Sequence, residues 1–89
     1  MSMDKEALIL KTQIELSIHR VKVLKSFEGA DVLRPTEIAE LTDIHINNVS
    51  KSLAQLKNMD LITLSTSKGR ARYYALTPLG KYILDYIDS

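Results

Sequence analysis

The stretch TEIAELTDIHINNVSKSLAQLKNMDLITLSTSKGRARYYALTPLG, residues 36–80, decides the fold. Its first half contains two helical patterns separated by a turn at Asp43. Thr36 is followed by acidic residues in the next turn of chain, where the helix dipole favours negative charge, so we predict that Thr36 caps the first helix. Spacings of three, four and three residues predict a second helix over 46–59, buried through Ile46, Val49, Leu53 and Leu56.

The hydrophobic period changes after residue 60. Two runs rich in β-forming side chains flank the segment SKGR (67–70), which contains the glycine that a tight hairpin turn needs. We therefore predict a β-hairpin over 61–76. Thr77 and Pro78 then suit the N-cap and the first position of a last helix.

The N-terminal segment, about residues 4–28, is expected to be helical. Ser17 is a good N-cap residue, so the segment is either one helix or two helices that meet there. An alternation of apolar side chains around Ser17 also allows a short extended piece. Gly29 is suited to end the segment in a left-handed conformation. Apolar side chains recur every three or four residues at Leu10, Ile14, Ile18, Val21, Leu24 and Phe27.

These elements predict a mainly α fold with a small β-hairpin, in the order α-(β)-α-α-β-β-α. The bracketed strand is a short extended link over 30–35, where Pro35 disfavours helix at the residue before it. We expect one domain over residues 1–89, because 89 residues is the size of a single domain. The helix-turn-helix unit spans 36–59 in this prediction.

Residues 36–80 resemble the winged helix-turn-helix domains of MarR-like and ArsR-like prokaryotic transcriptional regulators, bacterial or archaeal. The segment SIHRVKVLKSFEG (17–29) resembles the helix that comes before this unit, so the resemblance covers about residues 17–86. Ala39 is the small residue needed where the two helices cross. Asp43 stands where these regulators usually have glycine, and aspartate tolerates the left-handed conformation better than most residues.

The resemblance implies a small transcriptional regulator that binds double-stranded DNA in a sequence-specific way. The recognition helix 46–59 would enter the major groove, and the basic wing over 67–72 would contact the backbone or the minor groove. Amide side chains can hydrogen-bond adenine, and lysine can reach guanine or phosphate. The outward candidates on the helix are Asn47, Asn48, Ser50, Lys51 and Gln55. The candidates on the wing are Lys68, Arg70 and Arg72.

The charge is unevenly distributed along the chain. Residues 44–84 hold six basic residues and one acidic residue, although the whole chain has a net charge of +1. This asymmetry fits a surface that binds a polyanion, and it also fits an uneven solvated surface. A charged hairpin tip can likewise serve only to prevent edge-to-edge aggregation.

Both ends of the chain carry more apolar residues than one core stripe requires. We therefore expect the terminal segments 4–16 and 78–88 to form a homodimer interface, as the family resemblance also implies. The alternative is that these side chains only cover the small core. The candidates for dimerisation are Leu8, Ile9, Ile14, Tyr82, Ile83 and Tyr86.

We expect no metal, cofactor, small-molecule substrate or enzymatic activity. The chain has no cysteine, and so lacks the thiolates that ArsR-like metal sensors use. His19 and His45 are not linked by spacing to a carboxylate cluster, and no phosphate-binding glycine loop can be identified. The chain has no apolar run of membrane-spanning length, and its start does not resemble a signal peptide, so we expect a cytoplasmic protein.

Two other functions fit the same sequence. A non-specific DNA-coating or architectural protein can have this fold, and its binding would depend steeply on salt without a preferred sequence. Winged helices also serve as protein–protein interaction modules that do not bind DNA, because a fold does not fix a function.

Overall fold

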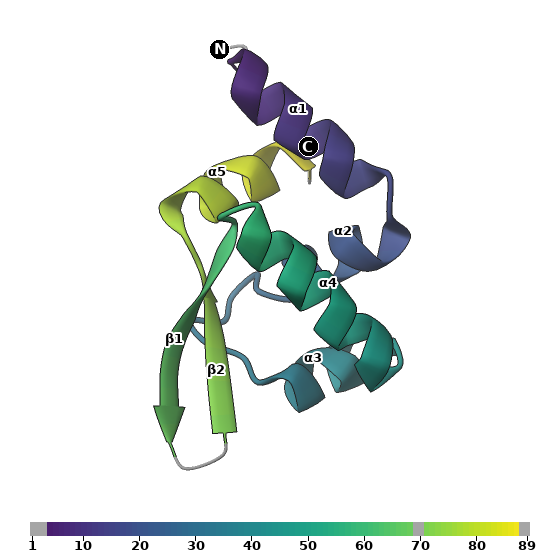
Figure 1. Ribbon diagram of the computed structural model, residues 1–89, viewed down its shortest axis with the longest axis vertical. Helices are drawn as coiled ribbons and strands as arrows, with labels where there is room; N and C mark the ends of the chain where they lie inside the picture. The colour runs from purple at the N-terminus through teal and green to yellow at the C-terminus, as the bar shows by residue number, and fades with distance from the viewer. Residues whose placement is uncertain (1–3, 69–70, 88–89) are drawn as a thin grey trace.

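The computed structural model describes residues 4–68 and 71–87. The described end of the hairpin, at residues 68 and 71, and the helix over residues 5–15 lie at opposite ends of the molecule, which is 42 Å long (Figure 1). Within the described ranges, no helix is long and apolar enough to cross a bilayer. The elements are α1 (Lys5–Glu15), α2 (Ile18–Lys25), α3 (Pro35–Thr42), α4 (Ile46–Asn58), β1 (Ile62–Lys68), β2 (Ala71–Leu76) and α5 (Pro78–Ile87).

The N-terminal segment forms two helices that meet at Ser17. Ser17 has an extended backbone, with φ −130° and ψ 118°, and its Oγ accepts a hydrogen bond from the Arg20 N–H at 3.4 Å. Of the alternatives left open by the sequence, the pair of helices is therefore correct, and the extended conformation is limited to Ser17. The break restarts the helical phase, so Ile18 is 67% exposed although the spacing predicted it to be buried.

The link between α2 and α3 contains the short strand that the sequence predicted, reduced to a single bridge. Leu33 and Tyr74 pair in antiparallel fashion, each N–H donating to the other's carbonyl at 2.9 Å. Helix α2 ends at Lys25, and Gly29 closes the turn that follows with φ 75°. The left-handed glycine was predicted, but it lies beyond the helix end and is not its cap.

The prediction that Thr36 caps α3 is wrong. The helix begins one residue earlier, at Pro35, and Arg34 is the N-cap residue. Proline is favoured at the first helical position because its φ is already helical and its missing N–H is not needed there. Glu37 supports this start, since its Oε1 accepts a hydrogen bond from the Arg34 N–H at 2.9 Å.

The turn between α3 and α4 has the geometry expected for a helix-turn-helix. Asp43 adopts the left-handed conformation, with φ 57° and ψ 30°. His45 caps α4, and its Nδ1 accepts a hydrogen bond from the Asn47 N–H at 3.1 Å. Helix α4 ends at Asn58, one residue short of the predicted boundary.

Replacing Asp43 with glycine should stabilise the protein. A left-handed conformation costs an L-residue roughly 1–2 kcal/mol, less for aspartate, and glycine avoids this cost. We expect Asp43→Gly to raise the melting temperature by about 4 °C, whereas Asp43→Val should lower it by a similar amount or more. Thermal unfolding followed by circular dichroism measures both. Asp31→Gly is the control, since Asp31 has no positive φ. Equal changes in the two glycine variants would contradict the explanation.

The predicted hairpin is present. Strands β1 and β2 pair antiparallel from Ile62 opposite Leu76 to Lys68 opposite Ala71, with an irregularity between Leu64 and Thr66. Strand β1 extends to Lys68, two residues closer to the tip than predicted, whereas β2 begins at Ala71 as predicted. The connection is residues 69–70, which lie outside the described ranges.

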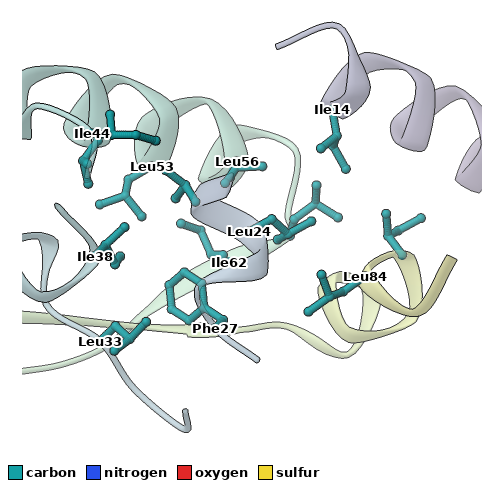
Figure 2. Close-up of a cluster of buried hydrophobic side chains, with 14 of the residues drawn as sticks. Ile14, Leu24, Phe27, Leu33, Ile38, Ile44, Leu53, Leu56, Ile62 and Leu84 are labelled. Carbon is teal, nitrogen blue, oxygen red and sulfur yellow. The ribbon is translucent and has the colours of Figure 1, made fainter. Parts of the chain in front are cut away.

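One continuous core joins all the helices to the base of the hairpin (Figure 2). Ile46, predicted to be buried, is instead 37% exposed. It is the first residue of α4 and lies at the edge of the buried stripe. The fully or nearly buried side chains include Ile14, Leu24, Phe27, Ile38, Leu53, Leu56, Ile62, Ile83 and Leu84.

Candidate nucleic-acid interface

Helix α4 has one buried face and one polar face. Val49, Ser52, Leu53 and Leu56 form the buried face, and they fix the rotation of the helix about its axis. The opposite side is exposed over the whole length of the helix. The predicted candidates Asn47, Asn48, Ser50 and Lys51 are all exposed, and they occupy the first turn and a half after the His45 cap.

Gln55, the fifth candidate on this helix, is not a free outward side chain. It is half-buried, and its Oε1 accepts a hydrogen bond from Nη1 of Arg20 at 3.1 Å. We therefore remove Gln55 from the DNA-contacting set. Helical spacing cannot predict this contact, because the two residues are 35 positions apart in the sequence.

The wing contributes one described basic side chain, Arg72, which is exposed on β2. The other two wing candidates, Arg70 and the side chain of Lys68, lie outside the described part of the chain. Tyr73 and Tyr74 face opposite sides of the strand, because consecutive side chains of a strand alternate. Tyr74 packs on the core, while the Arg34 guanidinium carbon lies 6.0 Å from the ring centre of Tyr73.

A groove of about 450 Å³ lies between α4 and the wing. Lys57 and Arg72 approach it from the two sides, one from α4 and one from β2. In the part of the chain that the structure describes, neither cation is paired with a carboxylate. The groove is lined by Pro35, Ser50, Leu53, Ala54, Lys57, Arg72 and Tyr74.

Lys57 is the functional candidate that the sequence argument missed. It follows Ser50 by seven residues, which is two helical turns, and so lies on the same side of α4. This spacing was available in the sequence, but the predicted contact positions on the helix ended at Gln55. Lys57 extends the candidate surface along the whole wing-facing side of α4.

A second cavity, of about 830 Å³, has the opposite electrostatic character. It lies between residues 27–32, the base of the hairpin and α5, and shares no lining residue with the α4 groove. Its lining includes the acidic residues Glu28, Asp31 and Asp85 and one basic residue, Lys81. A polyanion is therefore favoured at the α4 groove and disfavoured at this cavity.

The described residues contain no cluster of side chains that could bind a metal ion. They contain no group of three or more histidine, cysteine, aspartate or glutamate side chains placed to hold an ion. His45 uses its Nδ1 to cap α4, and His19 is a half-buried residue of α2.

The architecture is that of a winged helix-turn-helix protein: α3 and α4 form the helix-turn-helix unit, and β1 with β2 forms the wing. No protein-family model matches the sequence, and no curated protein matches it. Solved structures do match. A MarR-family transcriptional regulator from Silicibacter pomeroyi has a TM-score of 0.77 and 20% identity, over 92% of this chain and 56% of that one. The predicted resemblance to MarR-like regulators is thus confirmed for the fold.

Two further similar structures were solved with DNA. TubR from Bacillus thuringiensis, bound to 24 bp of tubC, has a TM-score of 0.80 and 21% identity, over 99% of this chain and 96% of that one. A mutant of MarR from E. coli in complex with operator DNA has a TM-score of 0.74 and 18% identity, over 93% of this chain and 61% of that one. The chain therefore spans little more than half of the MarR-family structures but nearly all of TubR.

Proposed function

We propose that this protein is a cytoplasmic transcriptional regulator that binds double-stranded DNA through α4 and the wing, and that it is not an enzyme. The observation that carries the proposal is the groove in which the exposed side of α4 meets Arg72 of the wing. With α4 in the major groove, Asn47 and Ser50 would face base edges near the helix N-terminus. Lys57 and Arg72 would then lie on either side of a phosphate backbone.

The related structures support this use of the fold. TubR was solved bound to tubC DNA, and the MarR mutant was solved with operator DNA. The charge of the present chain agrees, because residues 44–84 contain Asp60 as their one acidic residue.

Fluorescence anisotropy of a labelled random-sequence duplex tests the proposal. We expect binding at about 50 mM salt that weakens steeply toward about 200 mM, with a slope of about −0.9 in log K against log salt for each phosphate contact. Absence of binding at low salt would contradict DNA binding, and would favour a protein–protein interaction module.

Sequence-specific recognition depends on Asn47 in this proposal. Selection from a random pool should yield a preferred site, and Asn47→Ala should weaken binding by about 10-fold for each half-site contacted, the discrimination of one good base contact. Binding to random duplex should change little, since phosphate contacts are retained. Thr63→Ala on β1, also an exposed polar residue, is the control. Equal loss on both duplexes, or no preferred site, would favour the non-specific DNA-coating protein.

DNA segregation is a second candidate function. It is favoured by the match to TubR, which its structures describe as a type III plasmid segregation protein and which this chain covers over 89–96% of its length. A segregation protein is expected to bind repeated sites cooperatively, whereas a regulator of one operator needs only an isolated site. Titration of duplexes with one and with several copies of the selected site distinguishes the two functions.

We also propose that the protein acts as a homodimer through α1 and α5. Helix α1 and its C-cap residue Leu16 have an outer face opposite the core face, on which Leu8, Ile9 and Leu16 are 53%, 48% and 77% exposed. Tyr82 on α5 is 39% exposed and lies edge-on to Tyr86, with ring centres 5.2 Å apart. Leu16 was not among the residues predicted from the sequence.

Two of the predicted dimerisation residues do not belong to this surface. Ile14 and Ile83 are 0% exposed, because the core of the chain itself takes both side chains. Helix α1 thus has two apolar sides, and only the outer one is available to a partner.

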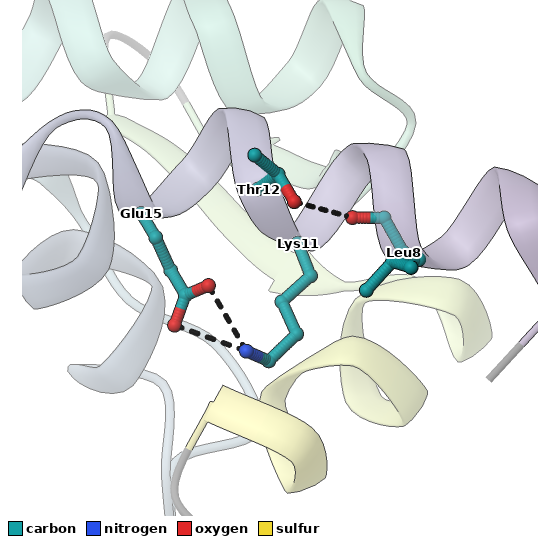
Figure 3. Close-up of polar contacts among 4 residues, drawn as sticks. All are labelled: Leu8, Lys11, Thr12 and Glu15. Atoms are coloured by element: carbon teal, nitrogen blue, oxygen red, sulfur yellow. Dashed lines mark hydrogen bonds and ion pairs between the residues drawn. The ribbon is translucent and has the colours of Figure 1, made fainter. Parts of the chain in front are cut away.

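Two pairs of groups on α1 satisfy their polar atoms within the helix (Figure 3). The Thr12 hydroxyl donates to the Leu8 carbonyl at 2.9 Å, and Lys11 forms an ion pair with Glu15 at 2.9 Å. These groups have their hydrogen-bond partners within the helix. Burying the outer face of α1 therefore leaves few hydrogen-bond donors without a partner.

Charging the outer face of α1 should dissociate the dimer. Two aliphatic side chains contribute roughly 1.5 kcal/mol each when buried, so Leu8→Glu/Ile9→Glu should raise the dimer dissociation constant by about 100-fold or more. Analytical ultracentrifugation measures this constant. Leu41→Glu on α3 removes a comparably exposed leucine, 64%, and should leave the dimer unchanged. A monomeric wild type, or a variant that still dimerises normally, would refute this interface.

A further inference from the structure

Arg20 connects three helices through one guanidinium group. It is the third residue of α2 and is half-buried. Its Nη2 donates to the carbonyl of Gln13 in the last turn of α1 at 2.7 Å. Its Nη1 donates to Oε1 of Gln55 on α4 at 3.1 Å. Helix α1 otherwise packs chiefly against α2 and α5, and Arg20 links it to α4 through these two hydrogen bonds.

The link is not the arrangement that stability alone favours. The Nε of Arg20 is buried and has no hydrogen-bond partner among the described residues. A buried donor without a partner is destabilising, and an apolar side chain of similar length would avoid it. What arginine supplies here is geometry, because its planar group fixes two acceptors in defined directions at the same time.

We propose that Arg20 is a positioning residue that sets the orientation of α4 relative to α1. The inference rests on the proposed function, in which α1 contacts the second copy of the chain and α4 contacts DNA. If the two recognition helices of a dimer are to reach two half-sites about one helical turn apart, each α4 must be held in a fixed relation to its α1. Arg20 provides this relation through Gln13 on one side and Gln55 on the other.

The DNA test compares a duplex that carries two copies of the selected half-site with a duplex that carries one. Arg20→Met should weaken binding to the two-site duplex by about 10-fold, a coupling within the usual range for two linked sites, and should leave binding to the single half-site unchanged. Gln55→Ala should give the same loss, and the double variant should lose no more than either single variant. Lys22→Met, which removes an exposed positive charge from the same helix, is the control.

A second measurement keeps the inference independent of DNA binding. The chain has no cysteine, so spin labels can be placed at Glu6→Cys and Asn58→Cys, two exposed positions on α1 and α4. With labelled chains diluted in unlabelled ones, the distance distribution should broaden in Arg20→Met and in Gln55→Ala, but not in Lys22→Met. An unchanged distribution in Arg20→Met overturns the inference. So does an equal loss of affinity on both duplexes, whereas a wild type that binds neither duplex refutes the proposed function.

Discussion

Replacing Gly80 with alanine will destabilise this protein, although glycine to alanine usually stabilises a helix. A Cβ at Gly80 would overlap the carbonyl oxygen of Leu61, which is backbone and cannot turn away. The expected cost is about 3 kcal/mol, against a gain of roughly 1 kcal/mol from helix propensity. The melting temperature should fall by more than about 10 °C.

The close approach at Gly80 is built by Thr77. The Thr77 N–H donates to the Leu61 carbonyl at 3.1 Å, and its hydroxyl donates to the Asp60 carbonyl at 2.7 Å. The same hydroxyl accepts from the Gly80 N–H at 2.9 Å, which caps α5. These bonds hold the start of α5 against the base of the wing, so α5 cannot shift to admit a methyl group.

Gly29→Ala is the matched control for Gly80→Ala. A Cβ at Gly29 meets no atom within 4 Å, but the φ of 75° is unfavourable for alanine. Its cost should be the smaller one of a left-handed residue, roughly 1–2 kcal/mol. Thermal unfolding of the two variants measures the difference. A Gly80→Ala variant as stable as the wild type would show that α5 does not sit against Leu61 in this way.

Removing Lys57 and Arg72 together should have the largest effect on DNA binding. If each cation neutralises one phosphate, Lys57→Ala/Arg72→Ala should lower the magnitude of the salt slope by about 1.8 for each protomer bound, and weaken binding at about 50 mM salt by roughly 100-fold per protomer. The control is Lys22→Ala/Lys81→Ala, which removes the same charge from α2 and α5. If the two double variants weaken binding equally, total charge and not the groove accounts for the affinity.

The elements that the sequence predicts well are those fixed by local chemistry. The spacing of Val49, Leu53 and Leu56 predicts α4 and its buried face, and Thr77 with Pro78 predicts the start of α5. Asp43 was expected to tolerate a left-handed turn and does so. In each case the interactions lie within a few residues, where periodicity and capping preferences apply.

The failures arise where distant contacts or a change of helical phase decide the outcome. Ile18 appeared to continue the stripe of the first helix, but the cap at Ser17 rotates the helix that follows. Gln55 has the spacing of an outward residue, and Arg20 draws it toward α2. Spacing also cannot tell which of two apolar faces the core uses, so Ile14 and the exposed Leu8 were grouped together.

The most direct test of the account is an amide chemical-shift titration of the protein with duplex DNA. We predict that the largest shifts fall on the outer side of α4 and on β2, at Asn47, Ser50, Lys51, Lys57 and Arg72. The amides of Asp31 and Asp85, beside the acidic cavity, should change little. Largest shifts at that cavity, or no shifts at low salt, would contradict the claim that α4 and the wing form a DNA-binding surface.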